Sequence, residues 1–325
     1  MIGIKPMANR QAMIFDIYRG TTHDGPGVRS TVFFKGCPLA CAWCHNPEGI
    51  SCSQAVWWDS RICIGCHLCL EACQYGANRS SEGRILIDDD KCQRCGACVE
   101  VCPANAMTFI GETRDLDSLV KEMLKDKAYY QQTGGGVTVS GGEPMMQHLF
   151  VADFFAELHR YGIHTALDTS GLVSWNAFEA VLPQTDMVLY DLKIMDSSQH
   201  KLHTGQSNEL IIDNVRRLAD GIKTGQYDVK LWIRTPLIPG ATSTVENIRA
   251  ISSFIASELA PAVSRWELCA FNNSCLTKYQ RLNKEWPYKD IGLLNRSDVN
   301  QMKDTAVSGG VSSDLIHVTG LVAEN

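Results

Sequence analysis

The sequence predicts an α/β fold, a parallel sheet of barrel type, with a small cysteine-rich domain inserted near its N-terminal end. Two observations support this prediction. Short apolar strand patterns alternate with helical patterns over residues 113–325, which is typical of βαβ units. Residues 53–112 are instead rich in cysteine and glycine and have little apolar periodicity. We therefore expect a core formed by residues 13–52 and 113–325, an insert at 53–112 and a short extension at 1–12.

The size and charge of the chain limit the classes of protein to which it can belong. It has 325 residues, a formal net charge of −6 and 45% hydrophobic residues, which fits one large domain with a small one attached. This mild acidity gives no basic face for nucleic acid. No apolar run approaches the ~18 residues that span a bilayer, and the first residues lack the apolar core of a secretory signal. We expect a cytoplasmic protein that binds neither nucleic acid nor a membrane.

The individual elements follow from local patterns. Strands are expected at residues 13–19, 31–36, 137–140, 164–168, 187–191, 229–234, 266–271 and 315–319, and helices at 115–126, 149–161 and 245–258. The strands are short runs of apolar, often β-branched residues. In the first helix, Leu116, Leu119, Val120 and Met123 recur at a spacing that places them on one face.

Distinctive polar residues follow six of these strands. They are Cys37, the run Gly141, Gly142 and Glu143, then Asp168, the pair Asp191 and Lys193, Arg234 and Asn272. The carboxyl ends of the strands of a parallel barrel lie on one face, and that face carries the active site. The sequence therefore predicts a site at this rim.

The motif Cys37-x3-Cys41-x2-Cys44 predicts an iron–sulfur cluster. Thiolates are soft ligands that favour iron, and in a reducing compartment the 14 cysteines of the chain are expected to bind metal rather than pair as disulfides. Three ligands for four irons leave one iron open to a chelating amino acid such as S-adenosylmethionine (SAM). A zinc knuckle with His45 or Cys52 as the fourth ligand is the alternative, but Cys-x3-Cys is the wrong spacing for common zinc pairs.

The insert carries two further cysteine runs, which repeat the spacing of bacterial ferredoxins. In that arrangement the fourth cysteine of each run serves the other cluster. One [4Fe–4S] cluster is therefore expected on Cys63, Cys66, Cys69 and Cys102, and a second on Cys73, Cys92, Cys95 and Cys98. A pair of zinc sites is the alternative. Trp57 and Trp58 are expected to cover the insert or its junction with the core.

Five segments carry a resemblance to a known family. They are HDGPGVR at 23–29, GCPLACAWCHNPE at 36–48, SGGEP at 140–144, LDTSG at 167–171 and DLK at 191–193. In this order they resemble the radical SAM activating enzymes of glycyl radical enzymes, over nearly the whole chain from residue 13. The resemblance implies a partial (β/α)6 TIM-type radical SAM barrel with an inserted α+β ferredoxin-like domain, and thus three [4Fe–4S] clusters and SAM as cofactors.

The resemblance also implies roles for single residues. The expected SAM contacts are Trp43, His45, Asn46, Gly141, Gly142, Glu143, Asp168, Asp191, Leu192, Lys193, Arg234 and Asn272. Within this set, Trp43 and Asn46 stand at the adenine, residues 141–143 receive the SAM amino group, and Asp168 and Asp191 are also placed to hold a monovalent cation. Asn272 stands where the family often has histidine. Asp24, Gly25 and Arg29 match the loop that meets the protein substrate.

The expected activity is hydrogen-atom abstraction from a glycine of a partner glycyl radical enzyme by a 5′-deoxyadenosyl radical. The step needs no catalytic side-chain acid or base beyond the SAM cluster. Flavodoxin or ferredoxin is the expected electron donor, and a monomer is the expected state. Two alternatives stay open at this point: a radical SAM enzyme that acts on a small molecule or makes another protein modification, and a ferredoxin-like electron-transfer subunit.

Overall fold

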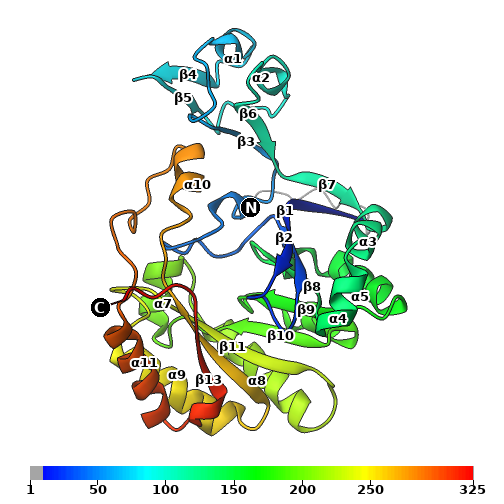
Figure 1. The fold of residues 1–325 in the computed structure, drawn as a ribbon, viewed down its shortest axis with the longest axis vertical. Coiled ribbons are helices and arrows are strands. Elements are labelled where there is room, and N and C mark those ends of the chain that lie inside the picture. Colours follow the sequence, from blue (N-terminus) through cyan, green and yellow to red (C-terminus); the bar gives the residue numbers. More distant parts are fainter. Residues whose placement is uncertain (1–9, 325) are drawn as a thin grey trace.

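A nine-stranded sheet forms the core of the computed structural model, which describes residues 10–324. Seven strands run parallel and neighbour one another in the order β2 (Arg29–Phe34), β8 (Gly136–Gly141), β9 (His164–Thr169), β10 (Met187–Asp191), β11 (Lys230–Leu237), β12 (Val263–Ala270) and β13 (Ile316–Thr319). Beyond β2, the antiparallel strands β1 (Gln11–Thr21) and β7 (Glu112–Asp115) extend the sheet. The α/β partial barrel is confirmed (Figure 1). Most of the predicted extension at 1–12 lies outside the described residues.

Helices follow the strands, and most of them cover the outer face of the sheet (Figure 1). They are α3 (Leu116–Leu124), α4 (Lys127–Thr133), α5 (His148–Arg160), α6 (Trp175–Val181), α7 (Ser197–Thr204), α8 (Glu209–Lys223), α9 (Val245–Phe254), α10 (Leu276–Arg281) and α11 (Arg296–Ser308). Short 3-10 turns lie at Pro47–Gly49, Pro144–Gln147, Leu182–Gln184 and Ser313–Leu315, and a π turn at Ile255–Leu259 continues α9. No helix within residues 10–324 is both long and apolar enough to cross a membrane.

Capping side chains fix where several helices begin. Asp115 accepts a hydrogen bond from the Ser118 amide at 2.9 Å, and Asp196 accepts one from the Gln199 amide at 2.8 Å. Each bond satisfies one of the amides that a helix start leaves without a partner. These caps lie directly after β7 and in the connection that follows β10, so they set where the chain turns back along the sheet.

The alternation of side chains along β11 shows how the sheet separates core from site. Leu231, Ile233 and Leu237 are buried against the helices, whereas Trp232 and Arg234 are partly exposed. Successive side chains of a strand point to opposite faces, so Arg234 lies on the inner, concave face of the barrel. The same alternation carries the other charged side chains of the strand ends inward.

The insert forms two small sheets of its own at one end of the molecule (Figure 1). Strand β3 (Ala55–Trp58) pairs antiparallel with β6 (Met107–Ile110), and β4 (Asn78–Ser81) pairs with β5 (Arg84–Ile87). The one-turn helices α1 (Leu68–Glu71) and α2 (Ala97–Glu100) lie within the two cysteine runs and contain Cys69 and Cys98. Its apolar core is small, centred on Val56, Trp58, Ile85 and Met107 with Cys69 and Cys98. Strand β7 then returns the chain to the large sheet.

Candidate functional site

The loop with Cys37, Cys41 and Cys44, here called the cysteine loop, leaves β2 at the sheet rim. The end of α7 holds it through the main chain, because the Ala40 amide donates to the Thr204 carbonyl at 2.8 Å. A second bond of this kind joins residues 42 and 203 at 2.9 Å. Two successive main-chain bonds fix the loop whatever side chains it carries.

Helix α10 holds the cysteine loop from another side. The Tyr279 hydroxyl donates to the Cys44 carbonyl at 2.8 Å. Next to it, the Lys278 ammonium donates to Asn46 Oδ1 at 2.8 Å and pairs with Glu48 Oε1 at 2.6 Å. Glu48 is buried, so the ion pair is shielded from water. The loop therefore has little freedom between its two supports.

The three thiols lie in a setting that suits metal binding. Burial raises the pKa of Cys44 to about 12 and raises the pKa values of Cys37 and Cys41, so cationic iron has to stabilise their thiolates. Within residues 10–324, no three His, Cys, Asp or Glu side chains are grouped closely enough for a single metal ion. Each iron of a [4Fe–4S] cube takes one thiolate, and three soft thiolates therefore leave one iron open. The donor set thus fits a [4Fe–4S] cluster.

Four charged side chains from the ends of β9, β10 and β11 meet on the inner face, and we call Asp168, Asp191, Lys193 and Arg234 the charged rim. Arg234 Nη1 lies 3.3 Å from Asp168 Oδ1, and Lys193 forms an ion pair with Asp191. Ser140 Oγ donates to Asp168 Oδ2 at 2.6 Å. The structure brings these residues together, as their positions at strand ends predict.

Burial and neighbouring charges set the protonation of the charged rim. Burial raises the pKa of Asp168 to about 6; Arg234 opposes this shift and Asp191 adds to it. Burial alone would lower the pKa of Lys193, but Asp191 and the nearby Cys41 sulfur hold that pKa above its usual value. At neutral pH Asp168 and Lys193 are therefore charged, and the Lys193 ammonium is within electrostatic range of the Cys41 sulfur.

The Gly141–Gly142 turn packs against the cysteine loop at backbone distance. Gly141 has φ +113°, and a Cβ on Gly142 would lie 2.3 Å from the Gly36 carbonyl oxygen. The Glu143 amide donates to that same carbonyl at 2.6 Å. Glycine is thus required for two different reasons, conformation at 141 and space at 142.

The Glu143 side chain is engaged within the protein. Its carboxylate is fully buried and accepts hydrogen bonds from Thr169 Oγ1 at 2.8 Å and from the Ser170 amide at 2.8 Å and hydroxyl at 2.6 Å. Since both carboxylate oxygens are occupied, the side chain joins residues 140–144 to 167–171. Only main-chain carbonyls of this turn are left to accept from an ammonium group.

Two predicted SAM contacts of the cysteine loop, Trp43 and His45, lie in different surroundings. Trp43 is buried, with its ring centroid 6.0 Å from that of His203. His45 stands edge-on to Phe271 and Trp286, each at 6.3 Å between ring centroids. Burial lowers the pKa of His45, so the ring is neutral near pH 7.

Three other predicted SAM contacts are also engaged within the protein. Asn46 donates to the Gly141 carbonyl at 3.4 Å, which keeps it beside the glycine turn. Asn272 Oδ1 accepts from the Ser274 amide at 3.1 Å, and the Leu192 side chain lies in the core with 2% of its surface exposed. The structure does not bring the side chain of Leu192 to the rim.

The loop at 23–29 needs one correction. Asp24 is partly exposed and accepts from Thr31 Oγ1 at 2.7 Å, and Gly25 is buried with φ +121°. Arg29, however, is fully buried and donates to Thr138 Oγ1 at 2.7 Å and to the Val137 carbonyl at 2.8 Å. Its guanidinium supports the loop from behind and cannot touch a partner protein.

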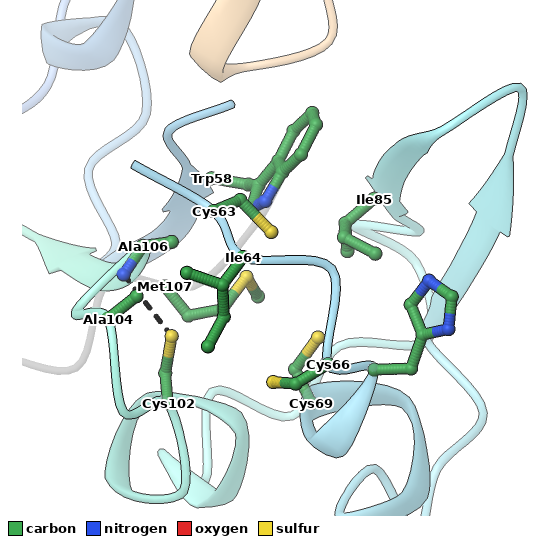
Figure 2. A pocket seen from close by; sticks show the side chains of 11 residues that line it. Trp58, Cys63, Ile64, Cys66, Cys69, Ile85, Cys102, Ala104, Ala106 and Met107 are labelled. Atoms are coloured by element: carbon green, nitrogen blue, oxygen red, sulfur yellow. Dashed lines mark hydrogen bonds between the residues drawn. The ribbon is translucent and has the colours of Figure 1, made fainter. Parts of the chain in front are cut away.

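The eight cysteines of the insert line two separate cavities. Cavity I includes Cys63, Cys66, Cys69 and Cys102 in its lining, and cavity II includes Cys73, Cys92, Cys95 and Cys98. Figure 2 shows the four sulfur atoms of cavity I, three from the first run and one from the second. The structure groups the cysteines in the two sets that the ferredoxin spacing predicts.

The two runs also repeat one another in detail. The fourth cysteine of each accepts an amide hydrogen bond from the residue four positions later. Ala77 donates to Cys73 Sγ at 3.3 Å, and Ala106 donates to Cys102 Sγ at 3.2 Å (Figure 2). Burial would raise the pKa of Cys73, but such backbone amides bring it below the usual value. These amides favour thiolates, and thiolates are the ligands of iron–sulfur clusters.

Sequence reasoning missed helix α10, which also contacts the insert. Arg281 pairs with Asp59 and lies over the Trp57 ring, 4.6 Å from its centroid. Asn283 just after the helix donates to the Ile85 carbonyl at 3.0 Å. In Figure 1, α10 lies between insert and barrel. Helix α10 itself contains no cysteine, histidine or acidic residue and stands at no strand end, so the sequence carries no signal for it.

Comparisons with known proteins add to this geometry. A family model described as the radical SAM superfamily matches residues 31–249. The chain is 37% identical over 284 residues to the isethionate sulfite-lyase activating enzyme of Oleidesulfovibrio alaskensis, covering 86% of this chain and 89% of the relative. It is 33% identical over 315 residues to the 4-hydroxyphenylacetate decarboxylase activating enzyme of Clostridioides difficile, covering 95% and 97%.

A likeness to one solved structure bears on the fold alone. A radical SAM methyltransferase from Sphaerobacter thermophilus matches with a TM-score of 0.52 at 15% identity, covering 95% of this chain and 73% of that one.

Proposed function

Because this chain belongs to the radical SAM superfamily and, within it, to the activating enzymes of glycyl radical enzymes, we propose that Cys37, Cys41 and Cys44 hold its SAM-binding [4Fe–4S] cluster. When bound, the cluster and SAM supply the chemistry: one electron cleaves the S–C5′ bond to methionine and a 5′-deoxyadenosyl radical, which takes a hydrogen atom from a glycine of the partner enzyme. The observation that carries this assignment is the charged rim at the strand ends from which the cysteine loop also leaves, with the charges of Lys193 and Cys41 close enough to interact.

The charged rim binds and orients SAM. Lys193 and Arg234 offset the negative charge of its carboxylate, and Asp168 accepts from a ribose hydroxyl. Main-chain carbonyls of the 141–143 turn accept from its ammonium group. Asp168 and Asp191 together also form a place for a monovalent cation. No residue of the rim has to move a proton.

A binding experiment tests this role of the rim. Calorimetry on reconstituted Arg234→Met should show SAM affinity at least tenfold below wild type, because the buried carboxylate of SAM then loses one of the cations that offset its charge. Arg265→Met is the matched control. Arg234 Nε lies 3.5 Å from Glu267 Oε2 and Arg265 Nε lies 2.9 Å from Glu267 Oε1, but Arg265 stands two residues earlier on β12, farther from the carboxyl end of that strand. Equal affinities of the two variants would contradict the assignment.

The two cavities of the insert are the proposed sites of auxiliary [4Fe–4S] clusters, and residues 53–112 are the proposed ferredoxin-like domain. Support comes from the two sets of four cysteines and from the amide bonds to Cys73 and Cys102. Cys102→Ser should therefore remove iron from cavity I, which the cysteines of the first run also line, although Cys102 belongs to the second run. Loss of the same EPR component from Cys102→Ser and Cys66→Ser, but not from Cys95→Ser, is the expected result.

The protein partner is a glycyl radical enzyme. The two relatives above are named for the enzymes isethionate sulfite-lyase and 4-hydroxyphenylacetate decarboxylase. We call these two enzymes the partner panel, and they serve to test which partner this chain activates. We further propose flavodoxin or ferredoxin as the electron donor, a monomeric state and a cytoplasmic location, where the reducing conditions that so many thiols need are met.

A further inference from the structure

One buried donor in the insert has no hydrogen-bond partner. The indole Nε1 of Trp58 is buried without a partner among residues 10–324, and 3% of the Trp58 surface is exposed. A buried donor left without a partner is destabilising, because it has lost its hydrogen bonds to water. Nearly all buried polar groups in proteins are therefore hydrogen-bonded, and this one needs an explanation.

The direction of the indole supplies the explanation. Trp58 lines cavity I, and Figure 2 shows its nitrogen on the side of the ring that faces the Cys63 sulfur. Apart from the cysteines and His67, the other lining side chains are aliphatic or Met. In such a setting the effective dielectric constant is low and a single donor has a large effect.

We propose that the Trp58 indole N–H donates a hydrogen bond to a sulfur atom of the cluster in cavity I and thereby makes that cluster easier to reduce. The inference rests on the proposed auxiliary clusters. Reduction adds one electron from an external one-electron donor to the cluster and moves no proton, so negative charge on its sulfur atoms increases. A donor aimed at those atoms stabilises the reduced form more than the oxidised form.

The neighbouring tryptophan provides a matched control. Trp57 is adjacent on β3, so its side chain points to the opposite face, and its Nε1 already donates to Thr108 Oγ1 at 2.5 Å. Trp58 stands five residues before the first cysteine run. The residue at the equivalent position before the second run is Ile87, whose side chain has no hydrogen-bond donor. The effect of Trp58 is therefore confined to one of the two auxiliary clusters.

The test is a redox titration of the full-length, reconstituted protein followed by EPR. The component from cavity I is the one that Cys66→Ser removes. Trp58→Phe should lower the equilibrium constant for reducing this component about tenfold, which is a shift of about 59 mV to more negative potential for one electron. Trp57→Phe should leave it unchanged. No shift in Trp58→Phe, or the same shift in both variants, overturns the proposal.

A second measurement needs no substitution at Trp58. In protein labelled with indole-15N tryptophan, the reduced component from cavity I should show a 15N coupling by electron–nuclear double resonance, and Trp57→Phe should retain it. Absence of the coupling overturns the proposal. If Cys66→Ser instead keeps all its iron and every EPR component, cavity I holds no cluster, and the proposed function of the insert fails rather than the role of Trp58.

Discussion

Single side chains at the rim carry charges that the barrel interior would otherwise exclude. Asp168 is stabilised as a carboxylate by Arg234 and by the Ser140 hydroxyl, while burial opposes ionisation and raises its pKa to about 6. The carboxylate is thus held near the point where modest acidification neutralises it. Protonation removes its charge and half of its capacity to accept hydrogen bonds.

This protonation predicts a pH dependence of SAM binding. Because the pKa of Asp168 is raised to about 6, the ionised form dominates above pH 6 and is lost as the pH falls below it. If only that form binds SAM well, the dissociation constant should rise about fourfold from pH 7.5 to pH 5.5. Calorimetry at both values measures it. Asp168→Asn should bind more weakly with no such dependence, and a wild-type profile in this variant would contradict the assignment.

The residue types at the site were predictable, but the surroundings of each side chain were not. Asp168, Lys193 and Arg234 were found because a strand end fixes the position of a residue. Glu143 and Arg29 match family motifs equally well, yet both are buried supports. Their roles depend on Ser170 and Thr138, which approach only in the folded chain. A sequence pattern contains no information on such tertiary contacts.

At the scale of elements, α10 connects the two parts of the molecule. Its six residues contact the cysteine loop through Lys278 and Tyr279 and the insert through Arg281. The longer strands and helices were predictable because their apolar residues repeat at period 2 or 3.6. A helix of one and a half turns has too few repeats for this, and its stability comes from its contacts.

This connection predicts the effect of removing Arg281. Arg281→Met should raise amide exchange at residues 55–61 and 84–87 about tenfold, since a partly buried ion pair is worth roughly 1–2 kcal/mol. Hydrogen–deuterium exchange with mass spectrometry measures it. Arg61→Met is the control, because Arg61 also pairs with Asp59 at 2.7 Å but is 61% exposed. Similar exchange in both variants would show that α10 does not hold the insert.

At the scale of the whole molecule, the barrel and the insert differ in how they are stabilised. The barrel has an extended apolar core between sheet and helices, whereas the insert has a few apolar side chains around its cysteines. Domains with so small a core usually need metal or disulfides for stability. The division into barrel and insert could be predicted from the sequence, because the amino-acid composition changes at the borders of residues 53–112. The contacts between the two parts could not be predicted.

Removal of iron should therefore affect the two parts differently. After anaerobic treatment with a chelator, chymotrypsin should cut first within residues 53–112, because cluster binding is part of the folding free energy there. Mass spectrometry of the fragments identifies the sites. The barrel should be cut at least tenfold more slowly. Equal cleavage rates in both parts would contradict the claim that the insert needs its clusters to stay folded.

The central claim concerns the cysteine loop and the charged rim, which together are expected to place a radical on a glycine of another protein. The direct measurement is EPR after anaerobic incubation of the reconstituted enzyme with SAM, a reductant and a glycyl radical enzyme, taken from its own genome and from the partner panel. We predict a glycyl doublet with at least one partner and none with Cys41→Ser. Formation of 5′-deoxyadenosine without a doublet for every partner would contradict the account.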